Sequence, residues 1–118
     1  VRVNAVAPGW VVSSGLNSYQ GTAVRAMMPA VASRVPLKRM GSESEISALV
    51  CFLLSEAAAF ITGTNIRIDG GASIGSPFFP LADHDKSSPF QGFHRQEAPD
   101  VIREMEAGSS QMQQPEMP

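Results

Sequence analysis

Few side chains in this sequence could act chemically, and none of them belongs to a complete reactive set. Cys51 is the only cysteine, and no histidine stands near it in the sequence to activate its thiol. Asp83, His84 and Asp85 carry metal-binding groups, but adjacent side chains rarely converge on one ion without further ligands. These patterns predict neither a cysteine nucleophile nor a metal site.

The dipeptide Pro8-Gly9 is the clearest candidate for a binding feature. It follows residues Val1 to Ala7, in which Val1, Val3, Ala5 and Ala7 share one face and Val6 lies on the other, a pattern typical of a strand covered on both sides. A strand that ends in Pro-Gly lets the backbone approach a flat ligand without obstruction by a side chain. The pattern therefore predicts a ligand site at the end of this strand.

Three further elements must position that site. Residues 10–40 are mixed in character and are expected to form a mobile segment over the site. They contain a helical stretch from Thr22 to Met28, and Pro29 and Pro36 predict that no single helix runs through the whole segment. Ser42 and Glu45 have the spacing of a capping box, which predicts the start of a helix. The alternating residues Asn65 to Asp69 then predict a strand that ends at Gly70-Gly71.

The helix of residues 45–55 is apolar around its whole circumference. Ile46, Leu49 and Leu53 follow the helical period, while Cys51 and Phe52 make the opposite side apolar as well. We therefore expect Cys51 to be buried, and we expect a second subunit to cover the side that faces away from the sheet. Since the helix joins two strands, the order also predicts a right-handed crossover between parallel strands.

Composition changes after Gly75, beyond which six of the nine prolines lie. This predicts a division into a folded part, residues 1–75, and a largely irregular extension, residues 76–118. Within the extension Pro99-Asp100 could open a short helix, and residues 108–118 are expected to be disordered.

The overall charge and hydropathy exclude some classes of protein. A formal net charge of -2 offers no basic surface for nucleic acid. The longest apolar stretch, Ile46 to Leu54, is about half the length needed to span a bilayer. A single cysteine is consistent with a reducing compartment.

Two sequence blocks, Arg2 to Gly9 and Ile61 to Gly71, resemble the late signature blocks of the short-chain dehydrogenases/reductases. The stretch Pro36 to Gly41 with the capped helix lies between them, as it does in that family. The resemblance covers Val1 to about Gly75. It implies an α/β fold, the C-terminal part of a doubly wound parallel-sheet Rossmann fold that binds a dinucleotide at the carboxyl ends of its strands.

The resemblance also implies which residues are missing. The family's Gly-rich turn, catalytic Ser and Tyr-x-x-x-Lys pair belong before Val1, and the only tyrosine, Tyr19, has Ala23 rather than lysine at the fourth following position. We therefore expect the chain to be a C-terminal fragment that holds no catalytic residue and is inactive as given. An alternative is a non-catalytic oligomerisation or binding module from a truncated family member.

By similarity to the family, the cofactor is NAD or NADP. Pro8 and Gly9 would line the nicotinamide ring, the Val11 backbone would meet its carboxamide, and Ser13 would supply a hydroxyl there. The family usually has Thr at the position of Ser13, and a solvated turn serine is the alternative interpretation.

Three apolar residues are candidates for substrate binding. Trp10 would form a wall of the substrate pocket, or else pack in the core. Met27 and Met28 lie where the family's substrate lid falls, or else serve helical packing.

The extension carries a finer resemblance. Ala82-Asp83-His84-Asp85, taken with Val50 to Ser55, is similar to the peroxisomal trans-2-enoyl-CoA reductases and their bacterial relatives. This implies a small-molecule or acyl-CoA substrate, and NADP if the chain is enoyl-CoA reductase-like. The family also implies a homodimer or homotetramer. Because the chain ends in Pro-Glu-Met-Pro rather than a Ser-Lys-Leu-like address, we expect a cytoplasmic location.

Overall fold

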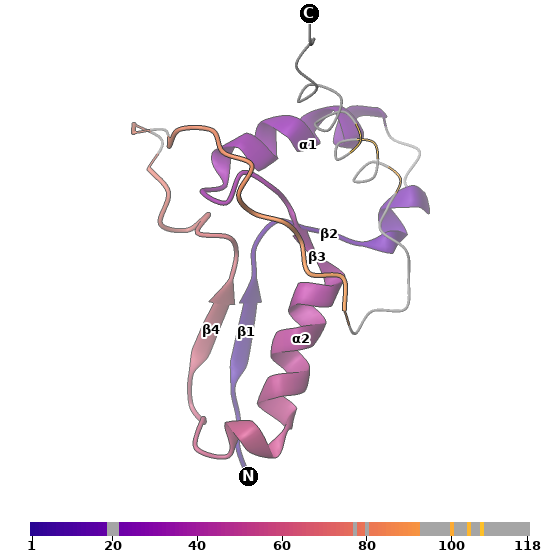
Figure 1. Cartoon of the computed structure of the whole chain (residues 1–118). Coiled ribbons are helices and arrows are strands. Elements are labelled where there is room, and N and C mark those ends of the chain that lie inside the picture. The colour runs from indigo at the N-terminus through magenta and orange to yellow at the C-terminus, as the bar shows by residue number, and fades with distance from the viewer. Residues whose placement is uncertain are drawn as a thin grey trace, which may run out of the picture.

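The computed structural model describes residues 1–18, 22–76, 78–79 and 81–92, together with the single positions 100, 104 and 107. Within the described part of residues 1–76 the elements are two short parallel strand pairs, two α-helices and two 3-10 helices, arranged as an α/β unit (Figure 1).

The main strand pair consists of β1 (Ala5–Pro8) and β4 (Asn65–Ile68), which run parallel. Ala5 lies opposite Asn65 and Pro8 opposite Ile68, and the Gly9 amide donates to the Ile68 carbonyl at 3.1 Å. Both predicted strands are therefore confirmed, although the first begins at Ala5 rather than Val1. Their carboxyl ends lie together at one end of the unit (Figure 1).

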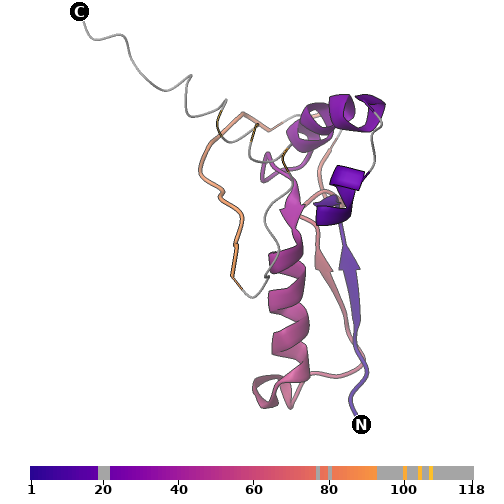
Figure 2. The ribbon, with the colours of Figure 1, turned by 90° about the vertical axis from the view of Figure 1, so that its right-hand side faces the viewer.

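The helix α2 (Glu43–Leu54) begins as its capping box predicts. The Ser42 hydroxyl accepts from the Glu45 amide at 3.3 Å, and the Glu45 carboxylate accepts from the Ser42 amide at 2.9 Å. Each side chain thus satisfies an amide that the first helical turn leaves unpaired. The helix then runs antiparallel to β1 on one face of the sheet (Figures 1 and 2).

Among the described residues, only one side of α2 is covered by other elements. Leu53 is buried, whereas Val50, Phe52 and Leu54 are exposed. Cys51 is also exposed, so the prediction that it is buried is wrong for this chain. The physical reason is that Cys51 lies on the side of the helix that faces away from the sheet, where no other described element packs.

The crossover from β1 to β4 has the opposite hand from the prediction. Figure 1 shows β4 to the left of β1, with both strands pointing up, and Figure 2 shows that α2 lies on the side of the sheet that faces the viewer in Figure 1. Seen from the side that carries α2, β4 therefore lies to the left of β1. The connection is therefore left-handed. The right-handed preference arises where a twisted strand feeds directly into the crossover helix. Here the chain first makes the long excursion of residues 9–42, which frees α2 from that constraint.

The excursion contains a second, minimal strand pair and a helix. β2 (Val11–Val12) runs parallel to β3 (Gly41–Ser42), with the 3-10 helix η1 (Ser14–Ser18) and α1 (Thr22–Arg34) between them. The predicted break at Pro29 is wrong, because α1 continues through it to Arg34. Pro29 removes the bond to the Arg25 carbonyl, but both residues are exposed, so water can serve that carbonyl instead.

A small core holds the excursion together. The buried side chains Val12, Met28, Ala32 and Met40 form one cluster, against which Leu16 and Val31 pack. Since Met28 and Ala32 belong to α1 and Met40 precedes β3, this core fixes α1 to both minor strands.

The turn between α2 and β4 contains the 3-10 helix η2 (Glu56–Ala58) and is fastened to the N-terminal residues. Arg2 and Asn4 donate to the Ile61 carbonyl at 3.3 and 3.0 Å, and the Thr64 amide donates to the Asn4 side chain. The motif residue Asn4 thus has a structural role here.

The extension is irregular where it is described, since residues 78–79 and 81–92 contain neither helix nor strand. The predicted helix near Pro99 lies outside the described residues apart from the helical positions 100, 104 and 107, and residues 108–118 lie wholly outside them. Within the part of the chain that the structure describes, no helix has the length and apolar character needed to cross a membrane.

Candidate cofactor and substrate site

The carboxyl end of β1 is exposed, and its residues Pro8 and Gly9 are called the ledge. Pro8 is the last residue of β1, and both it and Gly9 are exposed. A Cβ atom on Gly9 would meet Asp69 at 2.6 Å from its Cβ and 2.7 Å from its Cα. Glycine is therefore required at position 9 by the close approach of β4, whether or not a ligand binds. This is a different reason from the ligand approach that the sequence indicated.

Ser13 lies just beyond β2 and has an exposed side chain. Its carbonyl accepts from the Leu16 amide at 2.9 Å, while its hydroxyl has no hydrogen-bond partner among the described residues. Val11 is paired with Gly41 in the minor sheet and is half-buried. An exposed hydroxyl four residues after an exposed Pro-Gly turn can donate to or accept from the amide group of a ligand.

Trp10 stands beside an apolar cavity of about 370 Å³ on the α2 side of the ledge. Pro8, Gly9, Val11 and Ser13 do not line this cavity. Its walls come from the N-terminal half of α2, the end of β4 and residue 90 of the extension, and its lining residues include Leu37, Leu49, Ile68 and Phe90. Trp10 itself is 58% exposed, so core packing does not account for its position.

The two methionines of the predicted lid have different environments on α1. Met28 is buried in the core cluster, as the packing interpretation requires, whereas Met27 is 61% exposed. Neither lines the cavity beside Trp10. Contact with substrate stays a prediction for both.

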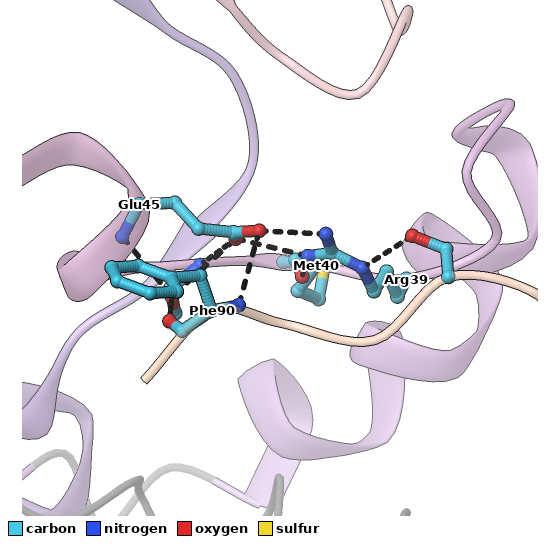
Figure 3. Close-up of polar contacts among 6 residues, drawn as sticks. Arg39, Met40, Glu45 and Phe90 are labelled. Atoms are coloured by element: carbon cyan, nitrogen blue, oxygen red, sulfur yellow. Dashed lines mark hydrogen bonds and ion pairs between the residues drawn. The ribbon is translucent and has the colours of Figure 1, made fainter. Parts of the chain in front are cut away.

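A polar cluster that sequence reasoning missed lies next to the cavity (Figure 3). Arg39 donates to both carboxylate oxygens of Glu45, at 2.9 and 2.6 Å, and both side chains are about four-fifths buried, with exposures of 20% and 18%. Burial by itself would raise the pKa of Glu45. The hydrogen bond from Arg39, the Ser42 amide and the charge of Arg39 instead hold this pKa below its ordinary value. The capping box indicated Glu45 from the sequence. Nothing indicated Arg39 as its partner, because Arg39 lies six residues earlier and precedes the helix, so that helical periodicity does not relate the two.

Asp69 closes the end of β4. The Asp69 carboxylate accepts from the amides of Gly71 and Ser73 at 2.9 and 3.0 Å. Hydrogen bonds from Ser73 lower the pKa of Asp69, with the largest effect from the Ser73 side chain and the next from the Ser73 amide. Gly70 has a positive φ of 61°, which glycine adopts at little cost. The Asp-Gly-Gly block is thus a turn that brings Asp69 against Gly9.

The residues of the acidic run in the extension do not converge. Asp83 lies 3.3 Å from the Lys38 ammonium, and the His84 ring nitrogen lies 2.9 Å from the Pro36 carbonyl. Within the described residues, no three His, Cys, Asp or Glu side chains gather where they could hold a metal ion.

Comparison with known proteins defines the class. Residues 1–73 match the family model described as Enoyl-(Acyl carrier protein) reductase. A tropinone reductase homolog of Arabidopsis thaliana is 42% identical over 74 residues, which cover 63% of this chain and 27% of that protein. The crystal structure of a short-chain dehydrogenase/reductase from Brucella melitensis superposes with a TM-score of 0.52 at 37% identity, covering 60% of this chain and 27% of the other.

The chain therefore belongs to the short-chain dehydrogenase/reductase family of oxidoreductases. A solved structure of a 4-hydroxyisoleucine dehydrogenase mutant complexed with NADH and succinate is also similar, with a TM-score of 0.50 and 32% identity over 64% of this chain and 30% of that one. The chain spans less than a third of the length of each of these proteins.

Proposed function

We propose that this chain forms the C-terminal part of an NAD(P)-dependent oxidoreductase subunit and supplies one wall of its nicotinamide site. The observation that carries the proposal is that Pro8 and Gly9, at the carboxyl end of β1, and Ser13, just beyond β2, are all exposed. In this arrangement Pro8 and Gly9 lie along the ring, and the Val11 backbone and Ser13 hydroxyl hold its carboxamide. The nicotinamide supplies or accepts the hydride.

The proposed substrate is a carbonyl compound, an alcohol or an enoyl thioester. The match to the Enoyl-(Acyl carrier protein) reductase family model supports the enoyl thioester. If the chain is enoyl-CoA reductase-like, NADP is the proposed cofactor. Trp10 supports an apolar substrate group, because it presents a large exposed ring directly after the ledge. The proposed location is the cytoplasm, and the presence of a single cysteine in these 118 residues is consistent with a reducing compartment.

The test is an assay of the full-length protein with trans-2-enoyl-CoA, a 3-oxoacyl thioester and a simple ketone. Each is supplied with NADPH and with NADH, and the absorbance of the reduced nicotinamide is followed. We expect oxidation of at least one nucleotide, and preference for NADPH if the enoyl thioester is the substrate. The 118-residue chain assayed alone should be inactive, because it contains no Tyr-x-x-x-Lys pair to exchange the proton. Absence of turnover by the full-length protein in every combination would refute the proposal.

Ser13→Ala in the full-length protein is expected to reduce turnover. Removal of one hydrogen bond to the carboxamide costs about 0.5–1.5 kcal/mol, which corresponds to about a two- to tenfold lower rate. The midpoint of urea unfolding should hardly change, because the Ser13 side chain is exposed. Ser13→Thr keeps the hydroxyl and should retain most of the rate. Equal steady-state constants for the wild type and Ser13→Ala would remove Ser13 from the site.

We also propose that the protein is a homodimer or homotetramer, with a two-fold interface formed by residues 45–55 and 65–69. The support is the exposed apolar side of α2 and the free edge of β4, which has a pairing partner only in β1 among the described strands. Exposed apolar side chains that cluster on one side of a helix favour association with another subunit.

A further inference from the structure

Residues 83–90, called the strap here, run along the segment that joins α1 to α2. His84 contacts the Pro36 carbonyl at 2.9 Å, Ser87 accepts from Arg39 at 2.8 Å, and the Phe90 carbonyl accepts from the Ser42 hydroxyl at 2.8 Å. The strap therefore follows residues 36–42 in the same chain direction, with a contact near each end and one in the middle (Figures 1 and 3).

These contacts differ in strength. The ion pair of Asp83 with Lys38 contributes little, because the Asp83 side chain is 95% exposed and solvent screens it. The bond from Arg39 to Ser87 is charge-assisted, and the guanidinium is held in place by its two bonds to Glu45. The Phe90 amide also donates to Glu45, at 3.4 Å. The strap is thus anchored mainly on the Arg39–Glu45 pair.

The same pair is linked to α1. The Arg39 guanidinium donates to the Met40 carbonyl at 3.1 Å, and the Met40 side chain is buried in the cluster with Met28 and Ala32 of α1. A continuous series of contacts therefore leads from Ser87 through Arg39 and Met40 to α1. At its far end the strap also places Phe90 in the wall of the cavity that Trp10 lines.

We propose that the strap holds the base of α1 in place and thereby positions substrate over the ledge, with Ser87 as a positioning residue. This rests on the proposed function, since α1 carries the two methionines of the predicted substrate lid. Without the Arg39–Ser87 bond the segment of residues 36–42 opens more often, and α1 loses its fixed position relative to β1.

The experiment compares Ser87→Ala with Ser88→Ala in the full-length protein. Ser88 is an exposed neighbour on the same strap whose hydroxyl has no partner among the described residues, so it is a matched control. Hydrogen exchange is measured at the amides of Leu37 and Gly41, which donate to the carbonyls of Gly70 and Trp10. The steady-state constants for substrate are measured in parallel.

We expect faster exchange at residues 36–42 and in α1 only for Ser87→Ala. We also expect the KM of Ser87→Ala for substrate to rise about fivefold or more, while kcat changes little. A fivefold change is at the lower end of the usual effect that one site has on ligand affinity at another. Equal exchange in the two variants would show that the strap does not hold the segment. Faster exchange with an unchanged KM would show that α1 does not position substrate, and either result overturns the proposal.

Failure of the proposed function is recognised separately, because it appears as absence of turnover in the wild type itself. The substrate part of the inference then falls with it, while the exchange comparison still decides whether the strap holds α1.

Discussion

Phe52→Asp in the full-length protein is expected to dissociate the oligomer into monomers. Phe52 is 42% exposed and lies on the uncovered side of α2 with Val50 and Leu54. Burial of one such apolar side chain contributes about 1.5–3 kcal/mol. In a two-fold interface each substitution acts twice, and the new carboxylates are desolvated without partners.

Sedimentation or light scattering at micromolar concentration measures the outcome. Val24→Asp is the matched control, because it places the same charge on α1 at a residue that is 45% exposed. This control should keep the mass of the wild type. A wild type that is monomeric, or a Phe52→Asp variant that keeps the full oligomeric mass, would contradict the interface. If that variant stays oligomeric but unfolds at lower temperature, another part of the same subunit covers α2.

Gly9→Ala is expected to lower the free energy of unfolding of the full-length protein by about 1–3 kcal/mol, the usual cost of overpacking. The new methyl group would stand 2.6 Å from the Asp69 Cβ and 2.7 Å from its Cα. Because one of these atoms belongs to the backbone, rotation of a side chain cannot relieve the contact, and the ends of β1 and β4 must separate. The bond from the Gly9 amide to the Ile68 carbonyl is weakened in the same movement.

Gly15→Ala provides the control for this substitution. Its Cβ would meet only the Ser13 hydroxyl, at an ordinary contact distance of 3.5 Å. Urea unfolding followed by circular dichroism compares the two variants with the wild type. We expect a clearly lower midpoint for Gly9→Ala and a small change for Gly15→Ala. Equal midpoints would mean that β4 does not approach Gly9 as closely as the structure places it.

Local and periodic features were predictable from the sequence. The start of α2 followed from Ser42 and Glu45, because a capping box involves only residues within one helical turn. The two main strands followed from their apolar patterns and the turn residues after them. Pro29 shows the limit of such local rules, since its cost depends on whether water can reach the Arg25 carbonyl, and exposure is a tertiary property.

Other features were decided only by contacts between residues far apart in the chain. The left hand of the crossover depends on how residues 9–42 fold before α2 begins, and the exposure of Cys51 depends on which side of α2 meets the sheet. The need for glycine at position 9 comes from Asp69, and the anchoring of Ser87 comes from Arg39. The Pro-Gly and Asp-Gly-Gly blocks together indicated the family and the end of the sheet at which we propose the cofactor site. Which side chains meet there was settled by packing, because sequence spacing encodes helical and strand periods but not the distance between separate elements.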